Sequence, residues 1–119
     1  MTLTEIQARV SKTAAFTGTG IDVSGITGDW TVKLQIESLT AAKQARFAFE
    51  DTVNDYTASL AGPTFSFKGS LTSSADKVKS FKKADFPSLR LGTASAQLRL
   101  KCSEMDSACT GVWRAWLEY

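Results

Sequence analysis

The chain of 119 residues contains no histidine. Histidine is the commonest general base, the usual partner of serine and cysteine nucleophiles, and a frequent zinc ligand. Its absence disfavours the enzyme classes that depend on it, and we expect a protein that is not an enzyme. The sequence accordingly predicts no catalytic residue, no cofactor site and no metal site.

A strong excess of charge and a long apolar run are also missing. The sequence has 14 Lys and Arg residues against 12 Asp and Glu residues, a net charge of +2, which is too small to make nucleic acid the expected partner. No apolar stretch reaches the roughly 20 residues of a membrane-spanning helix, and residues 1–5 lack the basic head and apolar body of a signal peptide. We expect one soluble domain, made in the cytoplasm, that binds neither nucleic acid nor a membrane.

Apolar and polar residues alternate in several segments, which is the pattern of half-buried antiparallel strands. The clearest segment runs over residues 30–37, and others cover 45–50, 65–68, 98–102 and 113–119. With turn glycines between them, they predict an all-β fold, an antiparallel two-sheet β-sandwich of the jelly-roll or Ig-like kind. Its expected core comprises Trp30, Val32, Leu34, Phe47, Phe49, Leu98, Leu100, Trp113 and Leu117.

Neighbouring segments of this pattern are predicted to pair as hairpins. Residues 38–43 would join the first two segments, and the polar loop 103–108 would join the last two. Residues 73–83 break the alternation and admit a short helical turn, because Val78 and Lys82 would then share one helical face.

The first sixteen residues differ from the rest and are interpreted as an N-terminal arm. Thr2 with Glu5 resembles a capping box, and Leu3, Ile6 and Val10 have helical spacing. An extended arm fits the same residues, so both conformations stay open. Either must dock on its own domain or on a neighbouring subunit, because so short a helix is marginal in water.

The chain has two cysteines, Cys102 and Cys109, which flank the polar loop 103–108. Directly opposed residues of two antiparallel strands approach to about 4.5 Å between Cα atoms, which suits a disulfide. Cytosolic thiols, in contrast, normally stay reduced. A disulfide and two free thiols are therefore both left open.

The densest charge in the sequence is a run of four lysines: Lys77, Lys79, Lys82 and Lys83. Lysines discourage further pairing at exposed sheet edges, and the same run would suit an acidic partner surface. The carboxylates are scattered and are interpreted as solubility charges: Glu50, Asp51, Asp55, Glu104 and Asp106.

Trp116 is singled out because it falls on the wrong side of the alternation. The pattern that turns Trp113 and Leu117 inward sends Trp116 outward, beside Arg114 and Glu118. Either the N-terminal arm covers it, or it lies at a subunit interface, where Trp and Arg are enriched.

Two stretches resemble a known group of proteins. Residues 17–30 hold a Thr-Gly-Thr-Gly turn, an Ile-Asp-Val run and a Gly-Asp pair before the first alternating strand, and residues 92–119 hold a Leu-Arg-Leu strand, a polar loop and an apolar terminal strand. These features resemble small β-sandwich proteins encoded among the head and structural genes of tailed bacteriophages and prophages. The likeness covers residues 17–119, the expected sandwich domain, and leaves residues 1–16 as the arm.

The resemblance implies a virion structural protein without an active site. A head decoration or cement protein is the first expectation, a tail or neck protein the second, and a carbohydrate-binding β-sandwich module is the alternative outside this class. The implied partners are the major capsid protein or another virion protein and further copies of the chain, and the implied location is the virion. The expected anchors are Leu3, Ile6, Val10 and Trp116, with Lys77, Lys79, Lys82 and Lys83 adjusting the register.

Overall fold

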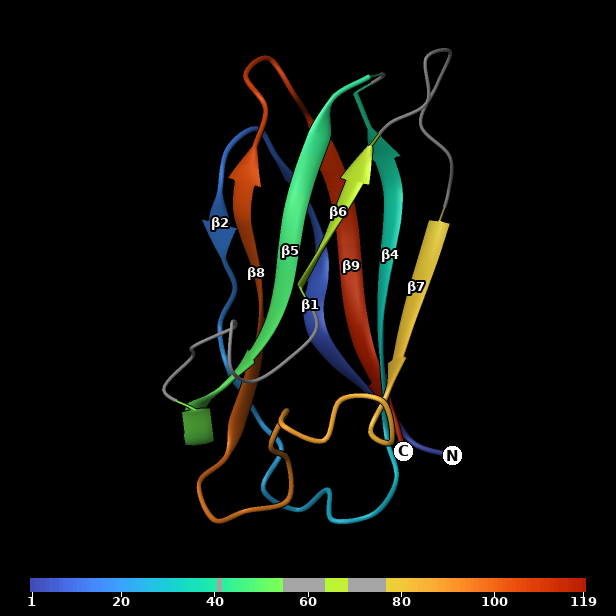
Figure 1. Ribbon diagram of the computed structural model, residues 1–119, viewed down its shortest axis with the longest axis vertical. Helices are drawn as coiled ribbons and strands as arrows, with labels where there is room; N and C mark the ends of the chain where they lie inside the picture. Colours follow the sequence, from blue (N-terminus) through green and yellow to red (C-terminus); the bar gives the residue numbers. More distant parts are fainter. Residues whose placement is uncertain (41, 55–63, 69–76) are drawn as a thin grey trace.

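The computed structural model of the chain describes residues 1–40, 42–54, 64–68 and 77–119. These residues form antiparallel strands in two sheets that pack face to face (Figure 1). The predicted all-β sandwich is confirmed. Over the described ranges, no helix has the length and apolar character needed to cross a membrane.

The first sheet has four strands in the order β1-β9-β4-β7. Their bounds are β1 (Leu3–Lys12), β9 (Gly111–Glu118), β4 (Thr31–Leu39) and β7 (Lys77–Lys82). In the second sheet, the short strands β2 (Phe16–Thr17) and β3 (Ile21–Asp22) both pair with β8 (Gln97–Met105). Beyond β8 lie β5 (Gln44–Asp51), which a 3-10 turn over Thr52–Asn54 follows, and β6 (Thr64–Lys68).

The strand order is that of a jelly roll rather than an immunoglobulin-like sandwich. The first half of the chain pairs with the second half in reverse: β1 with β9, β2 and β3 with β8, β4 with β7, and β5 with β6. This long antiparallel ribbon folds over itself, so that β9 also pairs with β4 and β8 with β5. The two sheets of a jelly roll arise in this way.

Both predicted hairpins are wrong. β4 and β5 belong to different sheets, and so do β8 and β9, so the connections that contain Thr40 and residues 106–110 are arches that cross from one sheet to the other. Alternation tells which face of a strand is buried, but it does not tell which strand lies beside it. The two arches hold each other: Thr110 N donates to Thr40 Oγ1 at 2.8 Å, and Gln44 N donates to Asp106 Oδ2 at 2.8 Å.

Two segments with helical spacing are strands. Residues 3–12 form β1, an edge strand that pairs with β9, with register shifts between Glu5 and Gln7 and between Gln7 and Val10. The extended conformation, docked on its own domain, is therefore the one that the structure shows. Residues 77–82 form β7 on β4, so the predicted helical turn is wrong there, and its remaining part lies outside the described residues.

The predicted core is confirmed at every position, because all nine side chains are buried. The rings of Phe47 and Trp113 join the two sheets, with centroids 5.0 Å apart in an edge-to-face contact. On the β7 side, the Phe49 and Phe81 rings make a similar contact at 5.9 Å. Inward residues of both sheets thus form one continuous apolar layer.

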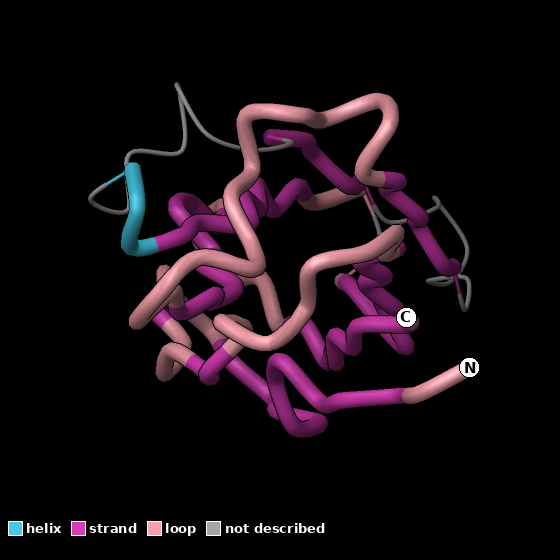
Figure 2. The backbone as a smooth tube through the Cα atoms, turned by 90° about the horizontal axis from the view of Figure 1, so that it is seen from below, coloured by secondary structure: helices cyan, strands magenta, loops and turns pink. Residues whose placement is uncertain are grey.

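Two loops, residues 23–30 and 83–96, close one end of the sandwich (Figure 2). Val23 N donates to Ala96 O at 3.0 Å, and Gly92 N donates to Val23 O at 3.0 Å. Gly92 has φ +78°, and a Cβ there would lie 2.6 Å from the carbonyl oxygen of Ile26. Only glycine fits this position, and its tight approach seals the core.

Candidate functional site: the outer face of the four-stranded sheet

The candidate site is the side of the four-stranded sheet that faces away from the core. Residues directly opposed in an antiparallel sheet point to the same side. One outward row crosses β1, β9, β4 and β7 with Leu3, Glu118, Thr31 and Lys82, and the next with Glu5, Trp116, Lys33 and Ser80. A third row holds Arg114, Gln35 and Val78. We call the surface made by these three rows the outer face.

Trp116 lies in the middle of the outer face and is fixed by its neighbours. Its Nε1 donates to Glu118 Oε2 at 2.8 Å, and Lys33 Nζ lies 3.0 Å from the same oxygen. The guanidinium carbon of Arg114 lies 5.0 Å from the centroid of the Trp116 ring, and Arg114 Nε donates to Gln35 Oε1 at 2.7 Å. These contacts hold an aromatic ring and a cation in one arrangement on the surface.

The carboxylate of Glu118 is the electrostatic centre of this group. Hydrogen bonds from Trp116 and then from Lys33 lower the pKa of Glu118 from its ordinary value of 4.5. Both donors favour the charged form of the acid. The arrangement is therefore intact at neutral pH and weakens in acid.

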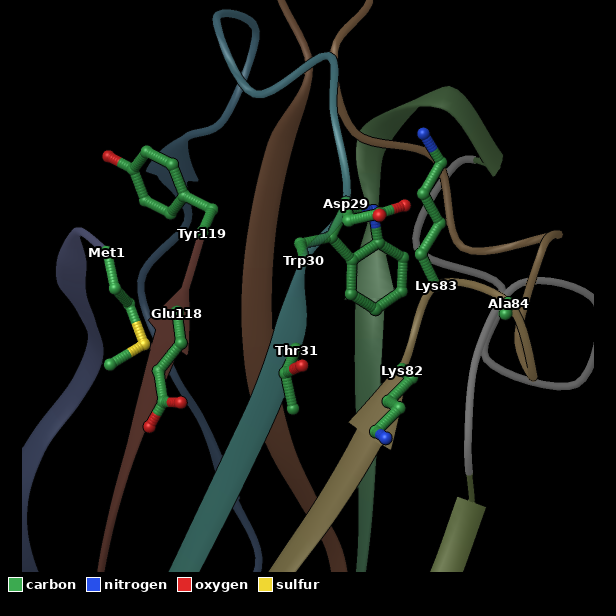
Figure 3. Close-up of a pocket in the computed structure, with 9 residues that line it drawn as sticks. All are labelled: Met1, Asp29, Trp30, Thr31, Lys82, Lys83, Ala84, Glu118 and Tyr119. Atoms are coloured by element: carbon green, nitrogen blue, oxygen red, sulfur yellow. The ribbon is translucent and has the colours of Figure 1, made fainter.

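Two hollows border one another on the outer face. One, of about 580 Å³, lies along β1 and β9 between Leu3, Glu5 and Trp116. The other, of about 480 Å³, lies where the chain termini meet β4 and β7. Figure 3 shows the second hollow, with Glu118, Thr31 and Lys82 side by side on three strands. Glu118 lines both hollows, so the concave surface continues across the sheet.

The structure confirms that Trp116 points outward beside Arg114 and Glu118, but it separates the other predicted anchors. β1 extends the sheet beside β9, with Glu5 opposite Trp116, so the N-terminal segment does not cover the tryptophan. Leu3 is 61% exposed on the outer face, whereas Ile6 is 4% exposed and belongs to the core. Val10 packs partly against that core. Ile6 is thus not available as a surface anchor, which corrects the expectation for it.

Lys79, Lys82 and Lys83 do not form one patch. Lys82 lies on the outer face opposite Thr31, whereas Lys77 and Lys79 occupy the alternate positions of β7, opposite Ile36 and Leu34. Lys83 follows the strand, and its Nζ donates to the carbonyl oxygens of Thr27 and Gly28, each at 3.3 Å. Only Lys82 joins Trp116 on the outer face, and Lys83 lines the hollow at its end.

Two carboxylates interpreted as solubility charges are buried and bonded instead. Asp51 is fully buried and accepts hydrogen bonds from Asn54 N at 2.9 Å, Asn54 Nδ2 at 3.0 Å and Arg90 N at 3.0 Å. Glu50 is buried, and its Oε1 lies 2.9 Å from Arg99 Nε. Both acids support the fold, which corrects the interpretation for them.

The remaining acids carry no site within the described ranges. Asp106 joins the two arches, Glu104 is exposed, and Asp55 lies outside the described residues. Over the part of the chain that the structure describes, no three His, Cys, Asp or Glu side chains are grouped to hold a metal ion.

Cys102 and Cys109 are buried free thiols in this structure. Burial raises the pKa of Cys102 from 9.0 to about 11, and the nearby Cys109 adds to the rise. Cys102 Sγ donates weakly to the carbonyl oxygen of Glu104 at 3.5 Å. A thiol with such a pKa is protonated at neutral pH and is a poor nucleophile.

The outer face is a candidate binding surface. It presents an oriented indole ring, one guanidinium, and single charges at its margins: Glu5 beside β9 and Lys82 beside β4. The sequence missed Lys33 and Gln35, because both lie on β4, about eighty residues from Trp116 along the chain; their alternation with Val32 and Leu34 was the only signal. Comparisons of the chain with protein-family models, curated proteins and solved structures give no match.

Proposed function

We propose that this chain is a non-enzymatic structural protein of a tailed-phage virion, a capsid decoration or cement protein that assembles on the outer shell. The observation that carries the proposal is the fixed Trp116 and Arg114 pair on the outer face. Trp and Arg are the residues most enriched at the energetic centres of protein interfaces. A ring that is already oriented loses little conformational freedom when a partner covers it.

Two further features support this class of function. The resemblance of residues 17–30 and 92–119 is to head and structural proteins of tailed phages. The jelly roll occurs widely in viral capsid domains, although a fold alone does not define a function. A tail or neck position belongs to the same class and would use the same surface.

A carbohydrate-binding module is the second candidate, because jelly rolls also serve as lectins and Trp116 is an outward aromatic residue. Sugars bind such rings by stacking on them. Here the guanidinium of Arg114 lies 5.0 Å from the ring centroid and occupies one of the two ring faces on which a sugar would stack. This contact favours the assembly role.

The test is binding to shells assembled from the major capsid protein whose gene neighbours the gene of this chain. We expect the purified protein to sediment with undecorated shells, and Trp116→Ala to reduce the bound copies at least tenfold, the effect of about 1.4 kcal/mol. Gln97→Ala, an exposed position on the second sheet, is the matched control and should bind as the parent does.

Three outcomes contradict the proposal. One is a gene neighbourhood without capsid or portal genes, and another is a parent protein that never sediments with shells. The third is saturable binding to a glycan that Trp116→Ala abolishes, which would favour the carbohydrate module instead.

A further inference from the structure

We propose that the outer face is a self-association surface, on which a second copy of this chain docks about a two-fold axis parallel to the strands. The inference names the partner that covers Trp116: a second copy of this chain takes the outer face, and a shell would then be bound by the dimer through another surface. It does not depend on a viral role. Its basis is the charge pattern at the two margins of the face, formed by Glu5 on β1 and Lys82 on β7.

Glu5 and Lys82 are charged side chains of this sheet that take part in none of its ion pairs within the described residues. Lys33 pairs with Glu118 and Arg9 with Glu37, whereas neither Glu5 nor Lys82 has a side-chain partner among the described residues. They cannot pair within one chain, because β1 and β7 are the outermost strands of the order β1-β9-β4-β7. Three strand spacings separate them by about 14 Å.

A two-fold axis between β9 and β4 brings these charges together. It places β1 of each copy over β7 of the other. Glu5 of each copy then lies near Lys82 of its partner, so the interface holds two such pairs. Lys82 shares a row with Leu3 and is one row from Glu5. The partner's Lys82 can therefore cover Leu3 with its aliphatic stem while its ammonium group reaches Glu5.

The residues at the centre of the outer face also fit a two-fold axis between β9 and β4. Trp116 and Arg114 on β9 lie next to the axis and would face the partner's β4, so each copy buries one fixed aromatic ring near the middle of the interface. A two-fold interface requires a surface that complements itself. A foreign surface of one charge sign would attract one margin of the outer face and repel the other. A second copy carries both signs and attracts both margins, which favours it as the occupant.

Charge exchange tests the proposal directly. The parent protein should be dimeric by sedimentation equilibrium, and each of Glu5→Lys and Lys82→Glu should weaken the dimer by about tenfold or more, because each places like charges opposite one another twice. The combination of both substitutions in one chain should restore the dimer. Glu104→Lys and Arg90→Glu, exposed positions off this sheet, are matched controls and should dimerise as the parent does.

Mixing the two single variants gives the sharpest result. Glu5→Lys and Lys82→Glu should each dimerise about tenfold more weakly than the parent when alone, yet form a mixed dimer at parent affinity, since every cross-copy pair is then of opposite sign. Any of three results would overturn the proposal: a monomeric parent, single variants without effect, or a mixture that stays monomeric. Thermal unfolding of each variant checks that the variant is folded. A dimer without shell binding would refute the phage role alone, and shell binding by a monomer would refute the self-association alone.

Discussion

Trp113 and Trp116 lie three residues apart on one strand and are held in opposite ways. Trp113 is fully buried between the sheets against Phe47, and its Nε1 has no hydrogen-bond partner among the described residues. Trp116 is half-buried on the outer face, and its Nε1 is bonded to Glu118. Packing in the core fixes the Trp113 ring and leaves its N–H without an acceptor, whereas polar contacts fix the Trp116 ring. The inner face thus supplies stability, and the outer face supplies an oriented surface.

The largest effect should come from emptying the inner position. Trp113→Ala should lower the free energy of unfolding by about 3 to 5 kcal/mol, because it removes buried apolar surface and leaves a cavity between the sheets. Trp116→Ala is the matched change on the outer face and should cost less than about 1 kcal/mol. Urea unfolding followed by circular dichroism measures both values. Equal losses at the two positions would erase the contrast between the faces.

Asp51 is a buried polar group whose oxygens accept hydrogen bonds, unlike the Trp113 indole N–H, so its replacement should change stability through those bonds. Asp51→Asn keeps the shape of the side chain but points an amide at donors of Asn54 or Arg90. A buried donor left without an acceptor costs about 1 to 3 kcal/mol, and we expect a loss of stability in this range by urea unfolding. Asp22→Asn, whose exposed carboxylate accepts hydrogen bonds from Ser24, is the control. A neutral Asp51→Asn would show that these hydrogen bonds contribute nothing.

Replacing the inner indole by a smaller ring separates packing from the orphaned donor. Trp113→Phe loses volume but also removes the unpartnered N–H, so the two effects oppose each other. We expect a net loss under about 1.5 kcal/mol. Phe49→Leu, a core contraction with no polar atom, is the comparison. If Trp113→Phe costs as much as Trp113→Ala, the orphaned donor carries no penalty.

The smallest effect is a pH dependence confined to the outer face. The pKa of Glu118 is lowered in the folded protein, so its stabilising contribution is complete above the ordinary value of 4.5 and is lost as the pH falls through the folded value. The parent should therefore exceed Glu118→Gln in stability at pH 7, and the two should converge below pH 4.5. A stability difference that does not shrink as the pH falls below 4.5 would exclude the ionised carboxylate as its cause.

The sequence predicts burial in this protein better than it predicts pairing. Alternation identified the inward residues of four strands correctly, because the side-chain period of a strand is a local property. The neighbours of a strand are not local: β4 (Thr31–Leu39) pairs with the last strand of the chain rather than with the next one. The spacing of Leu3, Ile6 and Val10 suggested a helix, yet two register shifts let β1 follow β9 as a strand.

The candidate site was predictable in part for the same reason. Trp116, Arg114 and Glu118 lie on one strand, so their common face follows from the alternation. Lys33 and Gln35 complete the group from another strand, and Asp51 meets Arg90 from a distant loop. Such contacts depend on which distant strands and loops lie side by side in the jelly roll, and no short stretch of sequence determines that.

The two ends of the chain lie side by side at one corner of the sandwich (Figure 1). Thr2 and Tyr119 exchange both backbone hydrogen bonds, and the ladder of β1 on β9 continues from there. A force that pulls the ends apart would therefore load this ladder at its first rung and open it like a zipper, one bond after another, instead of shearing all the bonds at once. The jelly roll is thus mechanically soft along the line that joins its ends, and a load-bearing attachment would have to grip it elsewhere.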